Sequence, residues 1–193
     1  MKKLIVIILT IATIFITLNC RTKGNHCDKV NDFIEFISGT YSHRNFTSGN
    51  VCNEMINRIL VAGHQAGSAG NQQHWHFTVI KNKELIDQIM PNVDEGNVLI
   101  VGLGPKESRF PREIVDFDNA LAMQNMFLVA QALGLGTRMY MRPLNNLNEN
   151  LLHKLEAPNN YRAIMILRIG QITDAVTQAS PRHPLETRVN FIK

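Results

Sequence analysis

Three short and almost purely apolar segments restrict the fold of this chain most strongly. They span residues 75–81, 97–102 and 163–170, with the sequences WHFTVIK, NVLIVG and AIMILRIG. Segments of this length are typical of strands, and an apolar run without polar alternation indicates a strand covered on both faces. Residues 137–141 are a fourth candidate strand. A sheet buried on both sides needs helices over it, so the sequence predicts a domain of α/β-like or α+β class.

Helical spacing of apolar residues predicts several helices between these strands. The strongest pattern spans 117–133 (FDNALAMQNMFLVAQAL), with Gly134 as the residue that ends the helix. Its apolar positions cover more than one stripe, so we expect burial on most sides or a place in a subunit interface. Asn50 is the predicted N-cap of an earlier helix. The other predicted helices span about 28–38, 51–60, 84–90 and 148–155.

The first twenty residues, MKKLIVIILTIATIFITLNC, are unlike a folded domain. Two lysines precede an apolar run that is shorter than the roughly 20 residues of a membrane-spanning helix, and this pattern is typical of a secretory signal. Cys20 resembles the lipidated cysteine of bacterial lipoproteins. We therefore expect an exported protein held at the cell envelope. The alternative is an uncleaved signal-anchor, including one whose domain faces the cytoplasm. The predicted segments are a signal at 1–20, a tether at 21–28 and a folded domain at 29–193.

Charge and cysteine content argue against several classes of protein. The formal net charge is +4, two of the lysines lie in the signal, and the other basic residues are scattered, so nucleic-acid binding is not expected.

Besides Cys20, only Cys27 and Cys52 are present, and they form no C-x-x-C motif for zinc or iron–sulfur clusters. They either pair in an oxidising compartment or remain free thiols. No Ser-His-Asp or Cys-His arrangement and no close carboxylate pair is apparent.

Two segments carry residues suited to a flat, phosphorylated ligand. In Y-S-H-R-N-F, Ser42 and Arg44 supply a hydroxyl and a guanidinium two residues apart, and both groups bind phosphate. In A-G-S-A-G-N-Q-Q-H-W-H-F, a small-residue loop lets the backbone approach a ligand, and Asn71 and Gln73 offer amide groups. Each segment alone is equally compatible with a solvated loop, or with a helix-to-strand turn that places Trp75 in the core.

Two further patterns are not expected to bind anything. His74 and His76 lie on one face of a predicted strand, but no carboxylate or cysteine stands at a suitable spacing, so no metal site is predicted. The G-L-G-P sequence at 102–105 lacks the third glycine and the following helix of a dinucleotide-binding turn.

Taken together, the motifs resemble the nitroreductase family, in which R-x-S-x-R-x-F is followed at the same separation by A-P-S-x-x-N-x-Q-P-W-x-F. FDNALAMQNMFLVAQALGLGTRMY is similar to the long interface helix and Gly-rich flavin loop of that family. AIMILRIGQI and PRHPLETRVNFI resemble its last strand and C-terminal segment. The resemblance runs from about residue 30 to the end. It implies an α+β fold with a mostly antiparallel sheet between two helical layers, and a homodimer.

The resemblance also implies a function. The protein would hold FMN without a covalent link and pass electrons from NADH or NADPH to a nitroaromatic, a quinone or another small flat acceptor. No side chain would be catalytic, because the flavin carries the chemistry. The implied flavin-binding residues are Ser42, Arg44 and Arg182 at the phosphate and ribityl chain, Asn71 with Ser68 and Gln73 at the ring, and Gly134, Gly136 and Thr137 close to the flavin.

The sequence departs from the family pattern at several positions. Tyr41 and Ser180 stand where Arg and Lys are common, and Gly67 and His74 replace two prolines of the flavin loop. We therefore expect a looser loop, with a lower FMN affinity or a different tilt of the ring. Two other functions remain open. One is a different flavin reaction, such as dehalogenation or flavin breakdown, and the other is a non-enzymatic flavin- or ligand-binding role.

Overall fold

The computed structural model describes residues 28–173 and 179–192 of the chain. These residues belong to two compact units, which we describe separately. The body comprises residues 41–173, and the second unit comprises residues 28–40 and 179–192. The predicted signal at 1–20, with Cys20, and nearly all of the tether, with Cys27, lie outside the described residues. Within the described part of the chain, no helix has the length and apolar content needed to cross a membrane.

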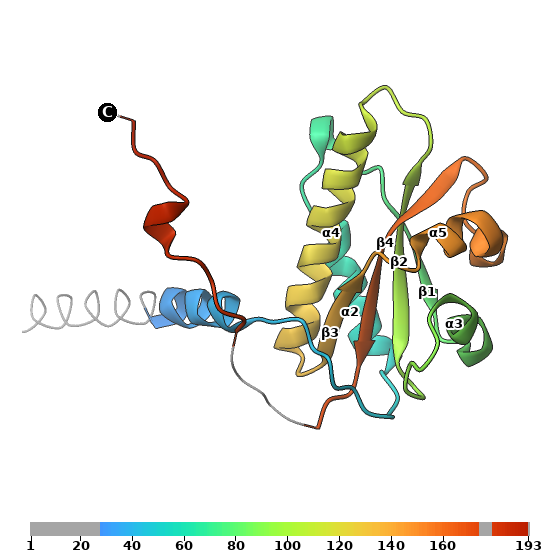
Figure 1. Cartoon of the computed structure of the whole chain (residues 1–193), viewed down its shortest axis with the longest axis horizontal. Helices are drawn as coiled ribbons and strands as arrows, with labels where there is room; N and C mark the ends of the chain where they lie inside the picture. The colour runs from blue at the N-terminus through green and yellow to red at the C-terminus, as the bar shows by residue number, and fades with distance from the viewer. Residues whose placement is uncertain (1–27, 174–178, 193) are drawn as a thin grey trace, which may run out of the picture. The chain divides into compact units, whose positions relative to one another are not determined.

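The body is built on a four-stranded antiparallel sheet with the strand order β1-β2-β4-β3 (Figure 1). The strands are β1 (His76–Ile80), β2 (Val98–Pro105), β3 (Gly136–Tyr140) and β4 (Tyr161–Gly170). Every predicted strand is present. The two longest, β2 and β4, form the middle of the sheet, and their register shifts between Gly102 and Leu103. The sheet therefore places its most apolar strands where both faces are covered.

Helices cover both faces of this sheet (Figure 1). One layer consists of α2 (Asn53–His64) and α4 (Arg112–Ala132), and the other of α3 (Lys83–Ile89) with a helical segment at 144–155. Along β2, Val98 and Ile100 pack toward the first layer, and Leu99 and Val101 toward the second. Successive side chains of a strand point to opposite faces, so a doubly covered strand has an unbroken apolar sequence. The predicted α+β fold, an antiparallel sheet flanked by helices, is confirmed.

The start of α2 differs from the prediction. Asn50 is not the N-cap: α2 begins at Asn53, with Cys52 as the N-cap residue and no side-chain capping bond. The backbone carbonyl of Asn50 instead accepts a hydrogen bond from the Gln171 side chain. An N-cap preference is weak compared with tertiary contacts, and here the chain between Gly49 and Val51 is held against Glu95 and Gly96.

The end of α4 was predicted correctly, but its start was not. The helix begins at Arg112 rather than at residue 117, and Val115 in its first turn is buried. Gly134 has a φ of 79°, and the N–H of Leu135 donates to the carbonyl of Ala130 at 3.0 Å. This is the Schellman arrangement, which a glycine in the left-handed region allows at low cost.

The helical segment at 144–155 is irregular, whereas a single helix was predicted over 148–155. It consists of α5 (Leu144–Asn146), a π-helical turn (Leu147–Leu151) and a 3₁₀ turn (Leu152–Leu155). The Asn148 carboxamide accepts from the Ala163 N–H at 2.8 Å and donates to the Ala163 carbonyl at 3.0 Å. Pairing of β3 with β4 ends at Tyr140 and Ile166, so Asn148 satisfies a part of β4 that β3 does not reach.

The second unit contains a helix over residues 28–39 and a tail with a 3₁₀ turn at Leu185–Thr187. The helix was predicted, and its apolar residues do lie at helical spacing. In the described structure, however, these side chains are exposed, and so are several of the tail. The exposed apolar residues are Val30, Phe33, Ile34, Ile37, Leu185, Val189, Phe191 and Ile192.

Candidate active site

The loop that follows residue 40 is bonded to the first residues of β3. The backbone N–H of His43 donates to the Thr137 carbonyl at 2.9 Å, and the Thr137 N–H donates to Nδ1 of His43 at 3.1 Å. Gln131, near the end of α4, donates from its side chain to the Tyr41 carbonyl at 2.8 Å and to Thr137 Oγ1 at 2.7 Å. These bonds join two segments that are far apart in the sequence and that were both predicted to hold the flavin.

Burial decides which side chains of this loop are available to a ligand. His43 and Phe46 are buried, whereas Ser42 and Arg44 between and beside them are exposed. None of the ion pairs within the described residues uses Arg44. The loop therefore presents a hydroxyl and an uncompensated guanidinium two residues apart, which suits a phosphate group.

The loop is also fixed to the end of the sheet through a buried arginine. The Arg168 guanidinium of β4 lies 4.0 Å from the centre of the Phe46 ring, and its Nε donates to Asn97 Oδ1 at 2.9 Å. The second donor group of Arg168 bonds Asp94 at 2.6 Å. The Asn97 amide then donates to the Thr47 carbonyl at 2.9 Å. A buried guanidinium is stable only when its donors are paired, and this network pairs them while holding residues 46 and 47 in place.

His43 is neutral in this arrangement. Burial lowers the pKa of His43. Because Nδ1 accepts the Thr137 N–H, the ring proton lies on Nε2. Protonation of Nδ1 would place a donor against a donor and break this side-chain bond, leaving only the backbone bond between residues 43 and 137.

The second candidate segment, residues 68–73, is a compact loop with strong internal bonding. Ser68 Oγ accepts the Gln73 N–H at 3.0 Å, and the Gln73 side-chain amide donates to Asn71 Oδ1 at 3.2 Å. Gly70, Asn71 and Gln73 have φ values of 56°, 53° and 50°. Asn tolerates this left-handed region better than most residues. Asn71 and Gln73 are exposed, so the loop presents amide groups from a defined backbone.

Asp118 anchors this loop to α4. One of its carboxylate oxygens accepts the Ala69 N–H at 3.0 Å, and the other lies 3.1 Å from Nδ1 of His74. Nε2 of His74 lies 3.1 Å from Oγ of Ser108, which in turn accepts the Phe110 N–H at 3.2 Å. Ser108, His74 and Asp118 therefore form a hydrogen-bonded set that is not apparent in the sequence. The three residues come from separate segments, so no local spacing reveals them.

The contacts of His74 also restrain the loop at 68–73, which was predicted to be looser than in the family. His74 stands where the family pattern has a proline, but its ring is almost entirely buried and bonded at both nitrogens. The ring of Phe110 also packs edge-on against it, with 5.7 Å between the ring centroids. At this end of the loop, side-chain contacts provide the restraint that a proline would provide through its fixed φ.

Comparison with known proteins connects these features. The profile of the Nitroreductase family matches residues 37–98, which contain both candidate segments, α2 and β1. A protein of Archaeoglobus fulgidus named "Putative NADH dehydrogenase/NAD(P)H nitroreductase" is 29% identical over 143 residues, which are 69% of this chain and 81% of that protein. The chain is therefore similar to proteins of the nitroreductase family, both in this segment and over most of its length. The predicted resemblance is confirmed.

Solved nitroreductase structures have the same fold. A nitroreductase with bound FMN from Desulfitobacterium hafniense superposes with a TM-score of 0.70 at 19% identity, and covers 83% of this chain and 97% of its own. A nitroreductase with bound FMN from Bacteroides fragilis gives a TM-score of 0.68 at 20% identity, with 83% and 98% covered. At these identities the likeness concerns the fold alone.

The other predicted flavin-binding residues, Gly136, Thr137 and Arg182, differ in their exposure. Gly136 and Thr137 are fully buried, and a Cβ on Gly136 would lie 2.3 Å from the Ile172 side chain and 3.4 Å from His43. Their visible role is to hold the loop that carries Ser42 and Arg44, and direct contact with the flavin stays a prediction. Arg182 is exposed in the second unit. Its predicted place at the phosphate also stays a prediction.

The structure also shows where Trp75, the G-L-G-P sequence and Cys52 lie. Trp75 is a core residue, 8% exposed and stacked on Phe77, and its Nε1 lies 3.4 Å from Nδ1 of His64. The G-L-G-P sequence lies inside β2, as its rejection as a dinucleotide turn requires. In the described part of the chain, no group of three or more potential ligands could hold a metal ion. Cys52 is exposed and free.

Proposed function

We propose that this protein binds FMN non-covalently and acts as an NAD(P)H oxidoreductase for a small, flat electron acceptor such as a nitroaromatic or a quinone. The observation that carries the proposal is the mutual bonding of His43 and Thr137, which brings together two separated segments with flavin-binding sequence patterns. Nitroreductases of the same fold from Desulfitobacterium hafniense and Bacteroides fragilis are described with bound FMN.

The exposed donors of the first loop fit the phosphate end of the cofactor. Ser42 offers one hydroxyl donor, and Arg44 offers a planar fork that bonds two phosphate oxygens. Arg182 of the second unit is proposed as a further guanidinium. A dianion held by side chains, without a glycine-rich phosphate loop, needs such charge-assisted donors.

The loop at 68–73 fits the ring end. Gln73 already donates to the carbonyl oxygen of the Asn71 side chain, so the Asn71 amide nitrogen is left to donate outward. Bound FMN supplies the hydride chemistry. The contribution of this loop is to hold amide donors at the ring edge where negative charge develops, and to do so without reorganisation, because Asp118 and His74 fix its backbone.

A visible absorption spectrum of the purified full-length protein tests the proposal. The protein should be yellow, or become yellow with added FMN. Its flavin bands should bleach with NADPH or NADH and return when a quinone is added. A protein that stays colourless in excess FMN contradicts the proposal. A coloured protein without turnover above background supports the non-enzymatic alternative. A substrate panel with product identification separates quinone or nitro reduction from dehalogenation and flavin breakdown.

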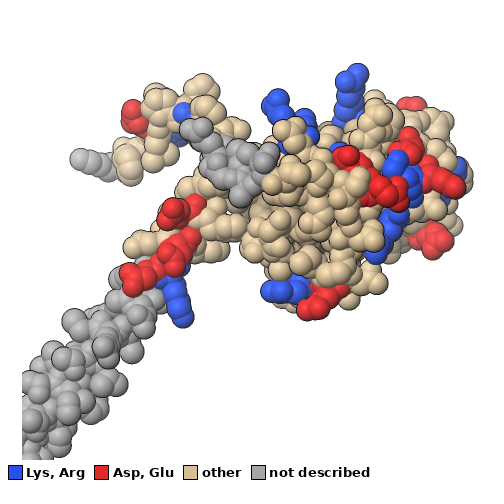
Figure 2. All heavy atoms as spheres, turned by 90° about the horizontal axis from the view of Figure 1, so that it is seen from below, with Lys and Arg blue, Asp and Glu red and all other residues tan. Residues whose placement is uncertain are grey.

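We also propose a homodimer. Two side chains of α4 lie on its outer side, Phe117 at 64% and Leu121 at 53% exposure, and Val61 of the neighbouring α2 is 60% exposed. These two helices pack on each other in one layer. The face of the molecule in Figure 2 shows Lys and Arg dispersed among Asp and Glu, with broad uncharged areas between them. Exposed apolar side chains grouped on adjacent helices are typical of a protein interface.

The location of the protein is proposed from its first twenty residues. We propose export followed by lipidation of Cys20, with an uncleaved signal-anchor as the alternative. Mass spectrometry of the mature N-terminus distinguishes the two. A diacylated or triacylated Cys20 at the first position supports the lipoprotein, and an intact Met1 supports the anchor.

A further inference from the structure

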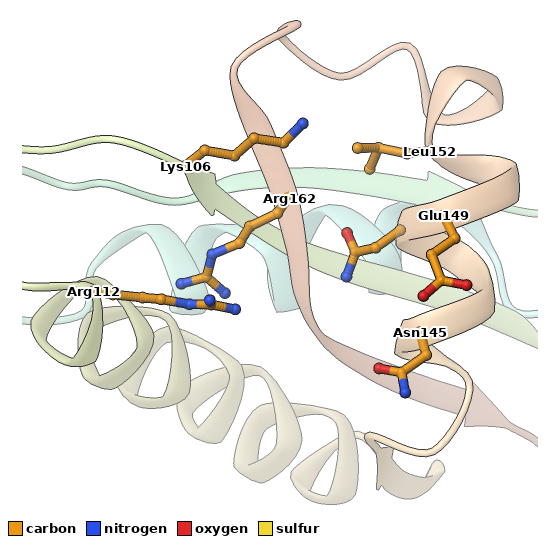
Figure 3. A pocket seen from close by; sticks show the side chains of 7 residues that line it. Lys106, Arg112, Asn145, Glu149, Leu152 and Arg162 are labelled. Carbon is orange, nitrogen blue, oxygen red and sulfur yellow. The ribbon is translucent and has the colours of Figure 1, made fainter.

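A polar hollow lies at one end of the sheet, and none of its lining residues belongs to the two segments proposed to hold the flavin. Its volume is about 400 Å³, which is at the lower end of the range for small-molecule sites. It lies between the end of β2, the first turn of α4, the start of β4 and the helical segment at 144–155 (Figure 3). The lining residues are Lys106, Arg112, Asn145, Asn148, Glu149, Leu152 and Arg162.

The two walls of this hollow differ in charge. The guanidinium groups of Arg112 and Arg162 lie together on one wall, and Lys106 extends from the end of β2 toward Leu152 (Figure 3). Glu149 and Asn145 extend from the helical segment opposite (Figure 3). Arg162 pairs with Asp116 at 2.5 Å. Among the ion pairs of residues 28–173 and 179–192, none involves Lys106, Arg112 or Glu149. The cationic wall therefore carries charge that the protein does not neutralise.

Hydrogen-bond donors on this wall also lack acceptors. Nε of Arg162 is buried and is one of two such side-chain atoms without a partner in the described structure. Arg112 is the first residue of α4, and the N-cap residue Pro111 offers no side-chain acceptor. A cation at the N-terminus of a long helix is unfavourable, because the helix dipole is positive there. A bound anion would relieve both the unpaired charge and the uncapped helix end.

The opposite wall indicates what the anion is attached to. The amide of Asn148 is committed to the Ala163 backbone, which leaves Glu149 and Asn145 as the exposed polar groups of this wall. A free carboxylate repels a second anionic group but accepts hydrogen bonds from hydroxyls. This wall therefore suits the hydroxyl-bearing part of a ligand whose charge lies against the arginines.

We propose that this hollow binds the phosphate group of a small hydroxylated molecule, such as a sugar phosphate or the phosphate-bearing ribose of a nucleotide. Arg112, Arg162 and Lys106 hold the phosphate, and Asn145 and Glu149 bond the hydroxyls. The site is additional to the proposed flavin site and does not depend on the oxidoreductase reaction.

Isothermal titration calorimetry on the full-length protein, saturated with FMN, tests the proposal with three kinds of probe. Ribose 5-phosphate should bind more tightly than inorganic phosphate, and ribose should not bind. Arg112→Gln should weaken ribose 5-phosphate about ten-fold, the loss expected for one charge-assisted contact. Glu149→Gln should reduce the preference for ribose 5-phosphate over phosphate. Arg58→Gln removes an exposed arginine of α2 outside the hollow and should change nothing.

A comparison of NADP⁺ with NAD⁺ distinguishes two sources of the phosphate. If NADP⁺ binds more tightly than NAD⁺ and Arg112→Gln abolishes the difference, the site binds the nucleotide 2′-phosphate. If NADP⁺ and NAD⁺ bind equally, the site binds a separate phosphorylated molecule. Absence of heat with all phosphate probes, or unchanged binding in Arg112→Gln, overturns the proposal. Flavin absorbance is recorded for each variant. Loss of FMN from Arg112→Gln would overturn the proposal by making the hollow part of the flavin site, whereas absence of FMN from the wild type contradicts only the proposed oxidoreductase.

Discussion

The His74 ring and the Asp118 carboxylate are joined by a 3.1 Å contact between Nδ1 and Oδ2, 44 positions apart in the sequence. The other oxygen of Asp118 accepts the Ala69 N–H, so one buried carboxylate fixes both ends of the loop proposed to face the flavin ring. A loop with three residues in the left-handed region keeps such a backbone only when its surroundings determine it. Asp118 therefore connects the stability of the body with the geometry of the site.

Asp118→Asn is expected to weaken both stability and FMN binding. The new amide can still accept the Ala69 N–H, but its NH₂ group then faces the N–H of His74. The mismatch should lower the free energy of unfolding by about 1–3 kcal/mol. Urea unfolding of the flavin-free protein measures this change, and flavin fluorescence measures the affinity. Asp87→Asn is the control, since its partner Lys83 is on the surface and the loss should be below about 0.5 kcal/mol. An Asp118→Asn protein with wild-type FMN affinity would contradict the positioning role.

Acid should destabilise the body through His43. Burial lowers the pKa of His43 in the folded state, so the unfolded chain takes up its proton first. The contribution to stability is complete above the unfolded value of about 6.5 and decreases as the pH falls below it toward the folded pKa. Unfolding free energies measured between pH 7 and pH 5 should show this decrease. The His43→Gln variant should lose this component of the pH dependence, whereas His153→Gln, an exposed histidine, should retain it.

Arg44→Gln should reduce the preference of the protein for FMN over riboflavin. The two flavins differ only in the phosphate, so a residue that bonds the phosphate affects FMN alone. Loss of one charge-assisted contact should weaken FMN about ten-fold and leave riboflavin unchanged. Equilibrium fluorescence titrations with both flavins measure the ratio. Arg142→Gln, an exposed arginine outside the loop, is the matched control. Equal weakening of both flavins would indicate a general disturbance of the loop and not a phosphate contact.

Gly136→Ala and Gly67→Ala should have opposite effects. A methyl group at 136 would lie 2.3 Å from the Ile172 side chain and 3.2 Å from Phe46, so we expect a loss of about 1–3 kcal/mol and a displaced loop. A methyl group at 67 meets nothing within 4 Å, and Gly67 is not in the left-handed region. Alanine there should be neutral or stabilise the protein by up to about 1 kcal/mol, because it restricts the unfolded chain. Thermal unfolding of the two variants is a direct comparison. A stable Gly136→Ala protein would show that residues 46 and 172 can move apart.

Leu121→Arg should convert the proposed dimer into a monomer. A guanidinium buried against a second copy of α4 would have no compensating partner. The dissociation constant of the dimer should therefore rise about 30-fold or more. Sedimentation equilibrium measures the molar mass of the wild type and the variant. Met141→Arg introduces the same charge at a residue of similar exposure, 65%, in the loop after β3, and should leave the dimer intact. A monomeric wild type at micromolar concentration would rule out the proposed interface.

The strands and most helices were predictable because the information for each is local. Burial on both faces makes β2 apolar at every position, and Gly134 marks the end of α4 by its own conformational freedom. The start of α4 and the irregular segment at 144–155 were not predictable. The first turn of α4 follows a proline-containing loop without a side-chain cap, and the irregular segment depends on the bonds of Asn148 to a distant strand.

Some residues of the candidate site were likewise predictable from the local sequence, and others were not. Ser42, Arg44, Asn71 and Gln73 were identified from two sequence segments, because the residue types and their spacing are themselves the motif. His43, Asp118 and Ser108 were missed as functional residues. His43 lay inside a quoted motif, but its role depends on a backbone 94 positions away.

By itself, the amino-acid sequence determined the class of fold, the positions of the strands and the segments that offer donors to a phosphorylated ligand, because each of these depends on neighbours within a few residues. The tertiary structure alone decided which of those donors are exposed, which buried carboxylate restrains their loop, and where three basic side chains line one hollow. Those properties depend on bonds and packing between segments that meet only when the sheet has formed.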